Sequence, residues 1–237
     1  MGVLSRAIFG KGELPERCMI YAGAYLPKKE GAVRGLFESW GKTKGNWIKY
    51  AYVKNAQKEI LVIFNVYGGA LLLEVLHILK DGGIRRIFFI GSMYAKALQI
   101  GTLVIPSSAM DMAGLVMVDD PGKIVTKPLA TSFEGIRGAL EGKGMPYAQG
   151  KIASVPCVFH GIDHVKEFID KSDDVLGVEA EVSTFYHFTR KLGLKGYVLL
   201  YVSDNRRYSI MSEAKQVREA KREALRNVTR VALEVLG

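Results

Sequence analysis

The sequence has little cysteine and no long apolar run, and both absences limit where the protein can work. Only two cysteines occur among 237 residues, and the spacing of Cys18 and Cys157 matches no metal site. Cys18 stands beside Met19 and Ile20, so we expect a buried free thiol. No apolar run reaches the ~18 residues of a membrane span, and residues 1–12 lack the apolar core of a signal peptide. We therefore expect a cytoplasmic protein with no membrane partner.

Acidic residues, asparagine and glutamine are scarce relative to the basic residues. Lysine and arginine together number 33 against 24 for aspartate and glutamate, which gives a net charge of +9. The basic residues are scattered and accompany no nucleic-acid-binding motif, so we expect no nucleic-acid partner. Abundant lysine, arginine and glutamate with little asparagine and glutamine is typical of a thermophilic source.

Apolar, β-branched runs alternate with amphipathic stretches along the whole chain, without a repeat or a linker. The length suits one domain spanning 1–237. The alternation predicts an α/β domain with a mixed, mostly parallel central sheet flanked by helices. We expect a loop at 119–127, and Ser212 as the cap of a last helix that ends at Leu236. The predicted strands are 18–24, 48–53, 59–66, 86–90, 101–106, 150–159, 175–178 and 195–202, and the predicted helices are 70–80, 132–142, 181–192 and 212–236.

Carboxylates follow two of the predicted strands. Ligands of parallel sheets bind beyond the carboxyl ends of strands, so we expect these residues to lie together. Glu179 and Glu181 precede a helix, and such a carboxylate either accepts two hydrogen bonds from a vicinal diol, as in ribose, or simply favours the helix dipole. Asp204 follows an apolar strand, where partial burial raises a carboxyl pKa and allows proton donation. The alternative is an aspartate that only caps a turn.

Glycines mark two further strand ends. We expect the strand 86–90 to end at Gly91-Ser92, where backbone N–H groups and a hydroxyl can hold a phosphate. Gly23 ends the first strand in the same way. A routine strand-to-loop turn is the alternative at both places. The four histidines form no metal constellation, so we expect no metal; they are His77, His160, His164 and His187.

Five partial motifs, in order, resemble the nucleoside phosphorylase family, which includes purine nucleoside phosphorylases, uridine phosphorylases and nucleosidases. Residues 88–106, FFIGSMYAKALQIGTLVIP, are similar to the family's strand with a Gly-Ser/Thr turn and a following Gly-Asp-x-Val-Ile-Pro segment. Val178-Glu179-Ala180-Glu181 resembles Val-Glu-Met-Glu, and Ser203-Asp204 resembles the Ser-Asp pair beyond it. Residues 18–23 and 150–159 are similar to the first strand and to the base-pocket strand.

The resemblance implies a pentosyltransferase of nucleoside-phosphorylase-like fold that cleaves the N-glycosidic bond of a nucleoside with phosphate, in purine salvage. It implies inorganic phosphate as co-substrate, no cofactor, and a homo-oligomer, either a dimer or a hexamer. An acid at position 204 favours purines, because it would protonate a purine ring nitrogen. The implied roles are Glu181 and Ala180 for ribose, Asp204 as the catalytic acid, Glu179, Phe159 and Val158 for the base, and Gly23, Gly91 and Ser92 for phosphate.

The phosphate side departs from the family pattern. The family's Gly-Asp-Pro-x-Arg loop is Gly23-Ala24-Tyr25-Leu26-Pro27 here, and Phe89-Ile90 stand where the family has an arginine. Each lost arginine removes a charge-assisted contact worth ~1.5–3 kcal/mol, and Lys28 or Lys29 is the nearest substitute cation. Three hypotheses stay open. They are a phosphorylase with a remodelled phosphate site, a nucleosidase in which Glu30 is the nearest acid to activate water, and a non-catalytic nucleoside-binding homologue.

Overall fold

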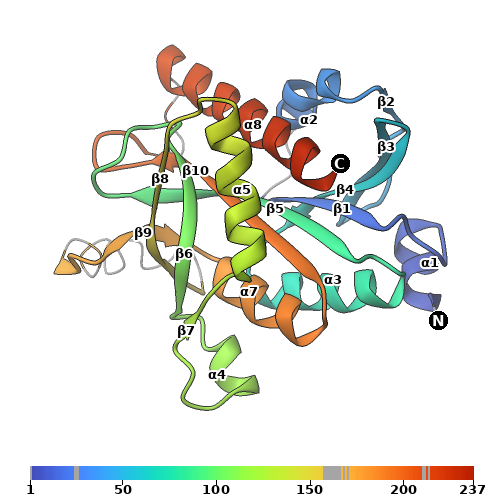
Figure 1. Cartoon of the computed structure of the whole chain (residues 1–237), viewed down its shortest axis with the longest axis horizontal. Coiled ribbons are helices and arrows are strands. Elements are labelled where there is room, and N and C mark those ends of the chain that lie inside the picture. The colour runs from blue at the N-terminus through green and yellow to red at the C-terminus, as the bar shows by residue number, and fades with distance from the viewer. Residues whose placement is uncertain are drawn as a thin grey trace.

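A computed structural model describes residues 2–23, 27–156, 167, 169, 171–209, 212 and 214–237, without the side chains of residues 27 and 28. It is a mixed α/β structure whose ten strands form one sheet with helices against both faces (Figure 1). The strands are β1 (Arg17–Ala22), β2 (Ser39–Trp40), β3 (Lys49–Asn55), β4 (Lys58–Val66), β5 (Arg86–Ala95), β6 (Leu103–Asp111), β7 (Val125–Thr126), β8 (Tyr147–Ser154), β9 (Val175–Glu179) and β10 (Lys195–Asp204). The helices are α1 (Val3–Phe9), α2 (Pro27–Val33), the 3-10 turn η1 (Arg34–Leu36), α3 (Gly69–Asp81), α4 (Leu115–Asp119), α5 (Ala130–Gly142), α7 (Val182–Lys191) and α8 (Lys215–Leu236).

The sheet closes on itself at one end and stays open at the other. Its strand order is β2-β3-β4-β1-β5-β9-β8-β6-β10, and β10 also pairs with β5, which closes five strands into a barrel. β4, β1, β5 and β10 are successive parallel neighbours, so their carboxyl ends meet at one edge. The strand pairs of the described chain are parallel and antiparallel in equal number rather than mostly parallel. Barrel closure contributes the antiparallel pairs β10–β6 and β5–β9, and the pairs of consecutive strands β2–β3, β3–β4 and β6–β7 contribute the other three.

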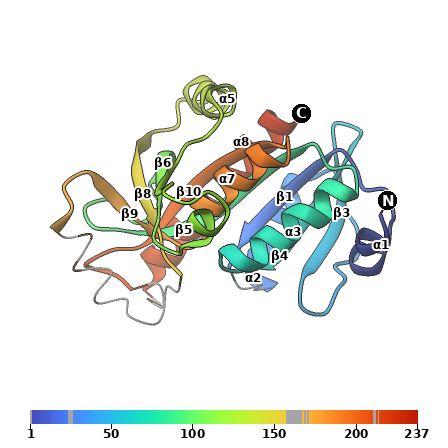
Figure 2. The same cartoon turned by 90° about the horizontal axis from the view of Figure 1, so that it is seen from below.

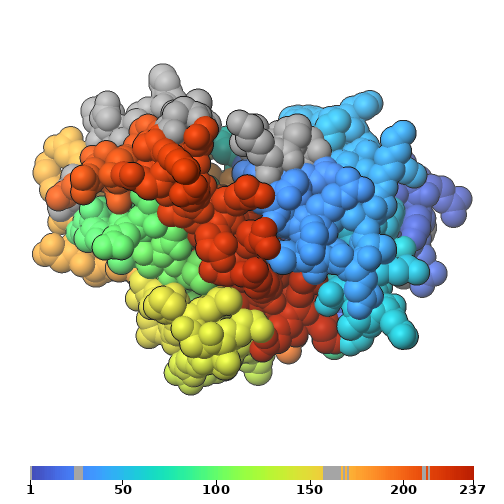
Figure 3. All heavy atoms as spheres, turned by 90° about the horizontal axis from the view of Figure 1, so that it is seen from above, coloured from blue at the N-terminus to red at the C-terminus, as the bar shows by residue number. Residues whose placement is uncertain are grey.

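Two layers of helices pack against the sheet. α3 and α7 pack together on one face (Figure 2). α8 lies between α2 and α5 on the opposite face, where Figure 3 shows it in red beside the blue of α2 and the yellow of α5. No helix in the described part of the chain is long and apolar enough to span a membrane.

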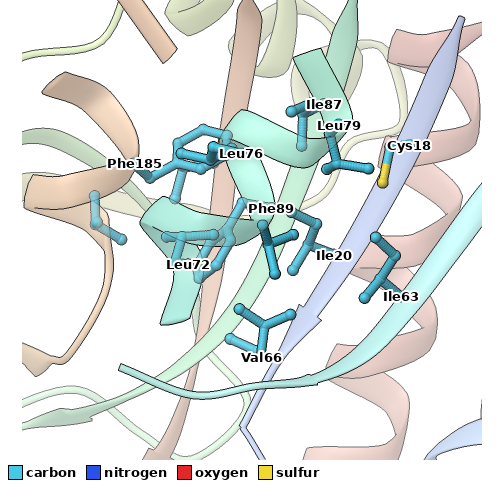
Figure 4. Packing of buried hydrophobic residues seen from close by; sticks show 14 of the residues in the cluster. Cys18, Ile20, Ile63, Val66, Leu72, Leu76, Leu79, Ile87, Phe89 and Phe185 are labelled. Atoms are coloured by element: carbon cyan, nitrogen blue, oxygen red, sulfur yellow. The ribbon is translucent and has the colours of Figure 1, made fainter. Parts of the chain in front are cut away.

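Strand β1 shows how the sequence specifies both layers. Cys18 and Ile20 pack into the cluster that faces α3 and α7, as Figure 4 shows, while Met19 and Tyr21 pack into the cluster that faces α8. Side chains alternate between the faces of a strand, so a strand covered on both sides is a continuous apolar run. The expected burial of Cys18 as a free thiol is confirmed, while Cys157 lies outside the described residues.

Several predicted boundaries are wrong, and the errors have physical causes. β5 does not end at Gly91 but continues to Ala95. Gly91 makes room for β10, because a Cβ there would lie 2.8 Å from Leu200 Cδ2. Ser212 does not cap the last helix, which begins at Lys215. The predicted loop at 119–127 contains β7, and the short helices α1, α2 and α4 were not predicted because their apolar patterns are too short to show a period.

Candidate functional site

The end of β5 lies between two carboxylate-bearing segments. Tyr94 is the register partner of Val178 on β9 and also of Asp204 on β10. Neighbouring strands are about 4.8 Å apart, so the backbones at Val178 and Asp204 are roughly 10 Å apart across β5. Gly177 allows β9 to approach the end of β5 closely, because a Cβ on residue 177 would overlap the Tyr94 carbonyl oxygen. The structure thus brings Glu179–Glu181 and Asp204 to the two sides of one strand end.

Glu179 supports the start of α7. Its Oε2 accepts hydrogen bonds from the backbone N–H groups of Glu181 at 2.6 Å and Val182 at 2.9 Å, and its Oε1 accepts one from the Ser154 hydroxyl. Ser154 Oγ in turn accepts the N–H of Ser183 at 2.8 Å. These N–H groups belong to the first turn of a helix and have no acceptor within it. Support of the helix start, which was the alternative for Glu181, is therefore given by the Glu179 side chain.

Glu181 joins the starts of two helices. It stands at the N-cap position of α7, and its Oε1 accepts a hydrogen bond from the backbone N–H of Gly68 at 2.7 Å. Gly68 has a φ of 79° and precedes α3. The neighbouring Gly69 faces Thr184 of α7 so closely that a Cβ would lie 2.5 Å from Thr184 Oγ1. The Gly68-Gly69 pair therefore lets α3 approach α7 and fixes the Glu181 carboxylate, which is only 5% exposed.

The two glutamates form a buried acidic pair. Burial, and then the charge of Glu181, raise the pKa of Glu179 to about 8, against the lowering effect of its hydrogen bonds. Burial also raises the pKa of Glu181, while the Gly68 N–H and the charge of Lys29 lower it. Two interacting carboxyl groups titrate as a pair. The pair therefore keeps a proton to higher pH than two separate glutamates would.

Lys29 brings a cation to the end of β1. Its Nζ donates a hydrogen bond to the carbonyl oxygen of Ala22 at 3.3 Å. The same nitrogen lies 3.6 Å from where a Cβ on Gly23 would be, and Gly23 has a φ of 81°, which favours glycine. Burial lowers the pKa of Lys29, and the charge of Glu181 raises it in part. Of the two substitute cations expected from the sequence, Lys29 therefore lies at Gly23 and interacts with Glu181, while the side chain of Lys28 is outside the described part.

Asp204 ends β10 as a buried acid. Its side chain is 5% exposed, and its Oδ1 accepts a hydrogen bond from the Ser203 hydroxyl at 2.7 Å. Ser203 Oγ also lies 3.3 Å from the carbonyl oxygen of Met93, which belongs to β5. The Ser-Asp pair is thus built into the β5–β10 contact instead of a solvent-exposed turn.

The two residues expected to hold phosphate on β5 lie inside the strand. Gly91 and Ser92 are register partners of Leu200 and Tyr201 on β10. Burial raises the pKa of Tyr201 to about 12, and a hydrogen bond with the Ser92 side chain opposes that rise. Ser92 therefore lies beside Tyr201 in the β5–β10 pair and not in a turn.

The remaining predicted residues are only partly placed. Ala180 is buried between the two glutamates. Val158 and Phe159, the expected base contacts, lie outside the described residues, as do residues 24–26 of the first loop. Two surface hollows, of about 350 and 430 Å³, are lined by none of the predicted site residues.

Sequence reasoning missed three supporting residues, Gly68, Ser154 and Asp111. Asp111 Oδ2 accepts the N–H of Val116 at the start of α4, and its Oδ1 accepts the Ser183 hydroxyl, both at 3.0 Å. The Gly68-Gly69 break before a helix was a visible signal for a close approach. Ser154 and Asp111 gave no signal, because their roles depend on β6, β8 and α7 meeting in space.

The chain is similar to known proteins of one superfamily. The family model described as the phosphorylase superfamily matches residues 69–237. The structure is similar to uridine phosphorylase from Vibrio fischeri ES114, solved with and without 6-hydroxy-1-naphthoic acid. The TM-score is 0.79, the identities are 17% and 18%, and the match covers 92% of this chain and 90% of that chain. It is also similar to the 5′-methylthioadenosine/S-adenosyl homocysteine nucleosidase of Campylobacter jejuni, with a TM-score of 0.75 and 14% identity over 93% of this chain and 98% of that chain. No curated protein matches the chain in sequence.

Proposed function

Because the chain belongs to the phosphorylase superfamily, we propose that it cleaves the N-glycosidic bond of a nucleoside. The observation that carries this proposal is the Glu181 carboxylate, which is buried at the carboxyl edge of the sheet and fixed by the Gly68 N–H. A fixed carboxylate can accept the hydrogen bonds of the ribose hydroxyls and stabilise the positive charge that develops on the sugar as the bond breaks. Ala180 would lie beside that sugar.

On the other side of β5, Asp204 has the role of the acid. Asp204 ends β10 beside the end of β5 and accepts a hydrogen bond from the Ser203 hydroxyl. This position suits a group that gives a proton to the departing base. An acid here favours a purine, because a purine ring nitrogen can accept that proton. We propose that residues 158 and 159 contact the base. Glu179, which was expected beside the base, instead has three donors of the protein on its oxygens and would act by holding Glu181 in place.

Phosphate is the nucleophile that the sequence resemblance implies, as a co-substrate held by Gly23, Gly91 and Ser92. A second candidate is water, and one observation favours it. Ser92 lies inside β5 beside Tyr201, and the cation at Gly23 is a single buried lysine that interacts with Glu181. A phosphate dianion placed there would meet the Glu181 carboxylate with one amine to offset its charge. The relatives represent both outcomes, since one is a phosphorylase and the other a nucleosidase.

The test is base release from inosine, adenosine, uridine and 5′-methylthioadenosine, each with and without inorganic phosphate. Release of base and ribose 1-phosphate that requires phosphate supports phosphorolysis. Release of base and free ribose without phosphate supports hydrolysis. Binding of these nucleosides without any turnover would refute cleavage and favour the non-catalytic homologue.

Assembly and cellular role belong to the same proposal. We propose a homo-oligomer, a dimer or a hexamer, that acts in the cytoplasm in purine salvage. Light scattering coupled to size-exclusion chromatography measures the mass directly, and a monomer at micromolar concentration would contradict this part.

A further inference from the structure

Helix α2 carries two ionisable residues in succession, and their contacts lie in different directions. Glu30 Oε2 accepts a hydrogen bond from Thr43 Oγ1 at 2.8 Å, and Glu30 Oε1 lies 3.9 Å from Arg34 Nη1. Lys29 instead contacts Ala22 and lies over Gly23. Successive residues of a helix are about 100° apart around its axis. The same helix therefore directs the amine to the end of β1 and holds the carboxylate against Thr43 and Arg34.

Each described carboxylate near the site already accepts hydrogen bonds from the protein or has another proposed role, so a different group is needed to activate water. Glu179 accepts three hydrogen bonds from the protein, and Asp111 accepts two. Glu181 is fixed where the ribose hydroxyls need it, and Asp204 lies across β5 on the base side. Attack by water on a sugar carbon is accelerated by a group that takes the proton of the water. Glu30, the acid that the sequence suggested for this task, is occupied by Thr43 and Arg34.

Resting on the proposed function, we propose that Lys29 is a catalytic residue, the general base that activates water for hydrolysis of the nucleoside. A proton of the water moves to the neutral Nζ while the water oxygen bonds to the anomeric carbon. The bond between that carbon and the base nitrogen breaks, and its electron pair stays on the base, which takes a proton from Asp204. The products are the free base and ribose. The Lys29 ammonium then loses its proton to solvent and Asp204 regains one.

Burial of Lys29 favours the neutral form of its amine. Burial lowers its pKa below the ordinary 10.5, and Glu181 is the charged group that opposes this shift. A neutral amine can donate one N–H to the Ala22 carbonyl and keep its lone pair for a proton of water. An arginine at this position would remain protonated, so the proposal depends on the amine and not on positive charge alone.

The experiment compares Lys29→Met and Lys29→Arg with the wild type in phosphate-free buffer. Lys195→Met is the matched control, because Lys195 is an exposed lysine at the opposite, amino end of β10. Base release and free ribose are measured with the same four nucleosides, nucleoside binding is measured by calorimetry, and folding by thermal unfolding. We expect both Lys29 variants to lose about 10²–10⁴-fold in turnover with little change in binding, and the control to keep its rate.

A second measurement uses the wild type alone, so that the proposal stays testable if a variant fails to fold. The base must be neutral and the acid Asp204 protonated, so kcat/KM should rise with pH toward the lowered pKa of Lys29 and fall where Asp204 loses its proton. A profile without that rise, or activity that Lys29→Arg retains, would show that Lys29 does not act as a base and overturn the proposal. Turnover that requires phosphate would overturn it and leave glycosidic cleavage intact. No turnover at all would overturn both.

Discussion

The carboxylates that follow β9 and the residues expected to hold phosphate both lie near the end of β5, but their polar groups are supported differently. Glu179 and Glu181 are buried and receive hydrogen bonds from Ser154 and from the starts of α3 and α7. Ser92 instead lies within β5 beside Tyr201 of β10, and a single lysine lies over Gly23.

This difference indicates which half of the site is already organised for a ligand. A buried carboxylate held by N–H groups keeps its position without a substrate, and such preorganisation is the main source of electrostatic catalysis. The half expected to bind phosphate offers one amine, whose pKa burial lowers. We therefore expect changes to these carboxylates to alter turnover more than changes to Gly23 or Ser92.

The largest expected effect comes from Glu181→Gln. The amide oxygen of glutamine can still accept the Gly68 N–H, but the negative charge that we propose stabilises the cationic sugar is lost. We expect turnover to fall by about 10²–10³-fold or more while the protein still folds, as for the loss of one preorganised group in other enzymes. Glu223→Gln, on the exposed face of α8, is the control. Unchanged turnover of Glu181→Gln would remove Glu181 from the mechanism.

The second effect tests whether Glu179 stabilises the folded protein by accepting the N–H groups at the start of α7. Glu179→Ala leaves the buried N–H groups of Glu181 and Val182 without acceptors, so we expect a loss of about 2–4 kcal/mol in the free energy of unfolding. Glu179→Gln keeps an acceptor and should cost much less. Urea unfolding measures both. If the alanine variant were as stable as the wild type, Glu179 would not be the cap of α7.

The sequence predicted the order of strands and helices well, because each buried strand is a continuous apolar run and each long helix has a clear period. It also predicted that Glu181 and Asp204 lie near one sheet edge, since both follow strands. It did not predict barrel closure, because the β10–β5 and β10–β6 pairings join segments far apart in the chain. Gly91 was misinterpreted for the same reason, since only the contact with Leu200 explains why a glycine stands inside β5.

The third effect is on the pH dependence of stability. The unfolded chain releases the Glu179 proton near its ordinary pKa of 4.5, whereas the folded chain keeps it until about pH 8. The folded state therefore binds more protons between these values, and its stability falls as the pH rises through them. We expect a loss of roughly 1–3 kcal/mol between pH 5 and pH 8 that Glu179→Gln reduces, measured by urea unfolding at each pH. Identical slopes for the two proteins would contradict the shift.

The smallest effect, and the sharpest test of the comparison, is Ser92→Ala. Because Ser92 lies inside β5 beside Tyr201, loss of its hydroxyl should cost at most the value of one internal hydrogen bond, about 0.5–1.5 kcal/mol of stability. The rate of base release should change by less than a few fold, and the same rate should be found with and without phosphate. Tyr201→Phe removes the neighbouring hydroxyl and serves as the matched variant. A phosphate-dependent reaction whose KM for phosphate rises tenfold in Ser92→Ala but not in Tyr201→Phe would show that Ser92 binds phosphate after all. In that case Ser92 would belong to the ligand site as Glu181 does.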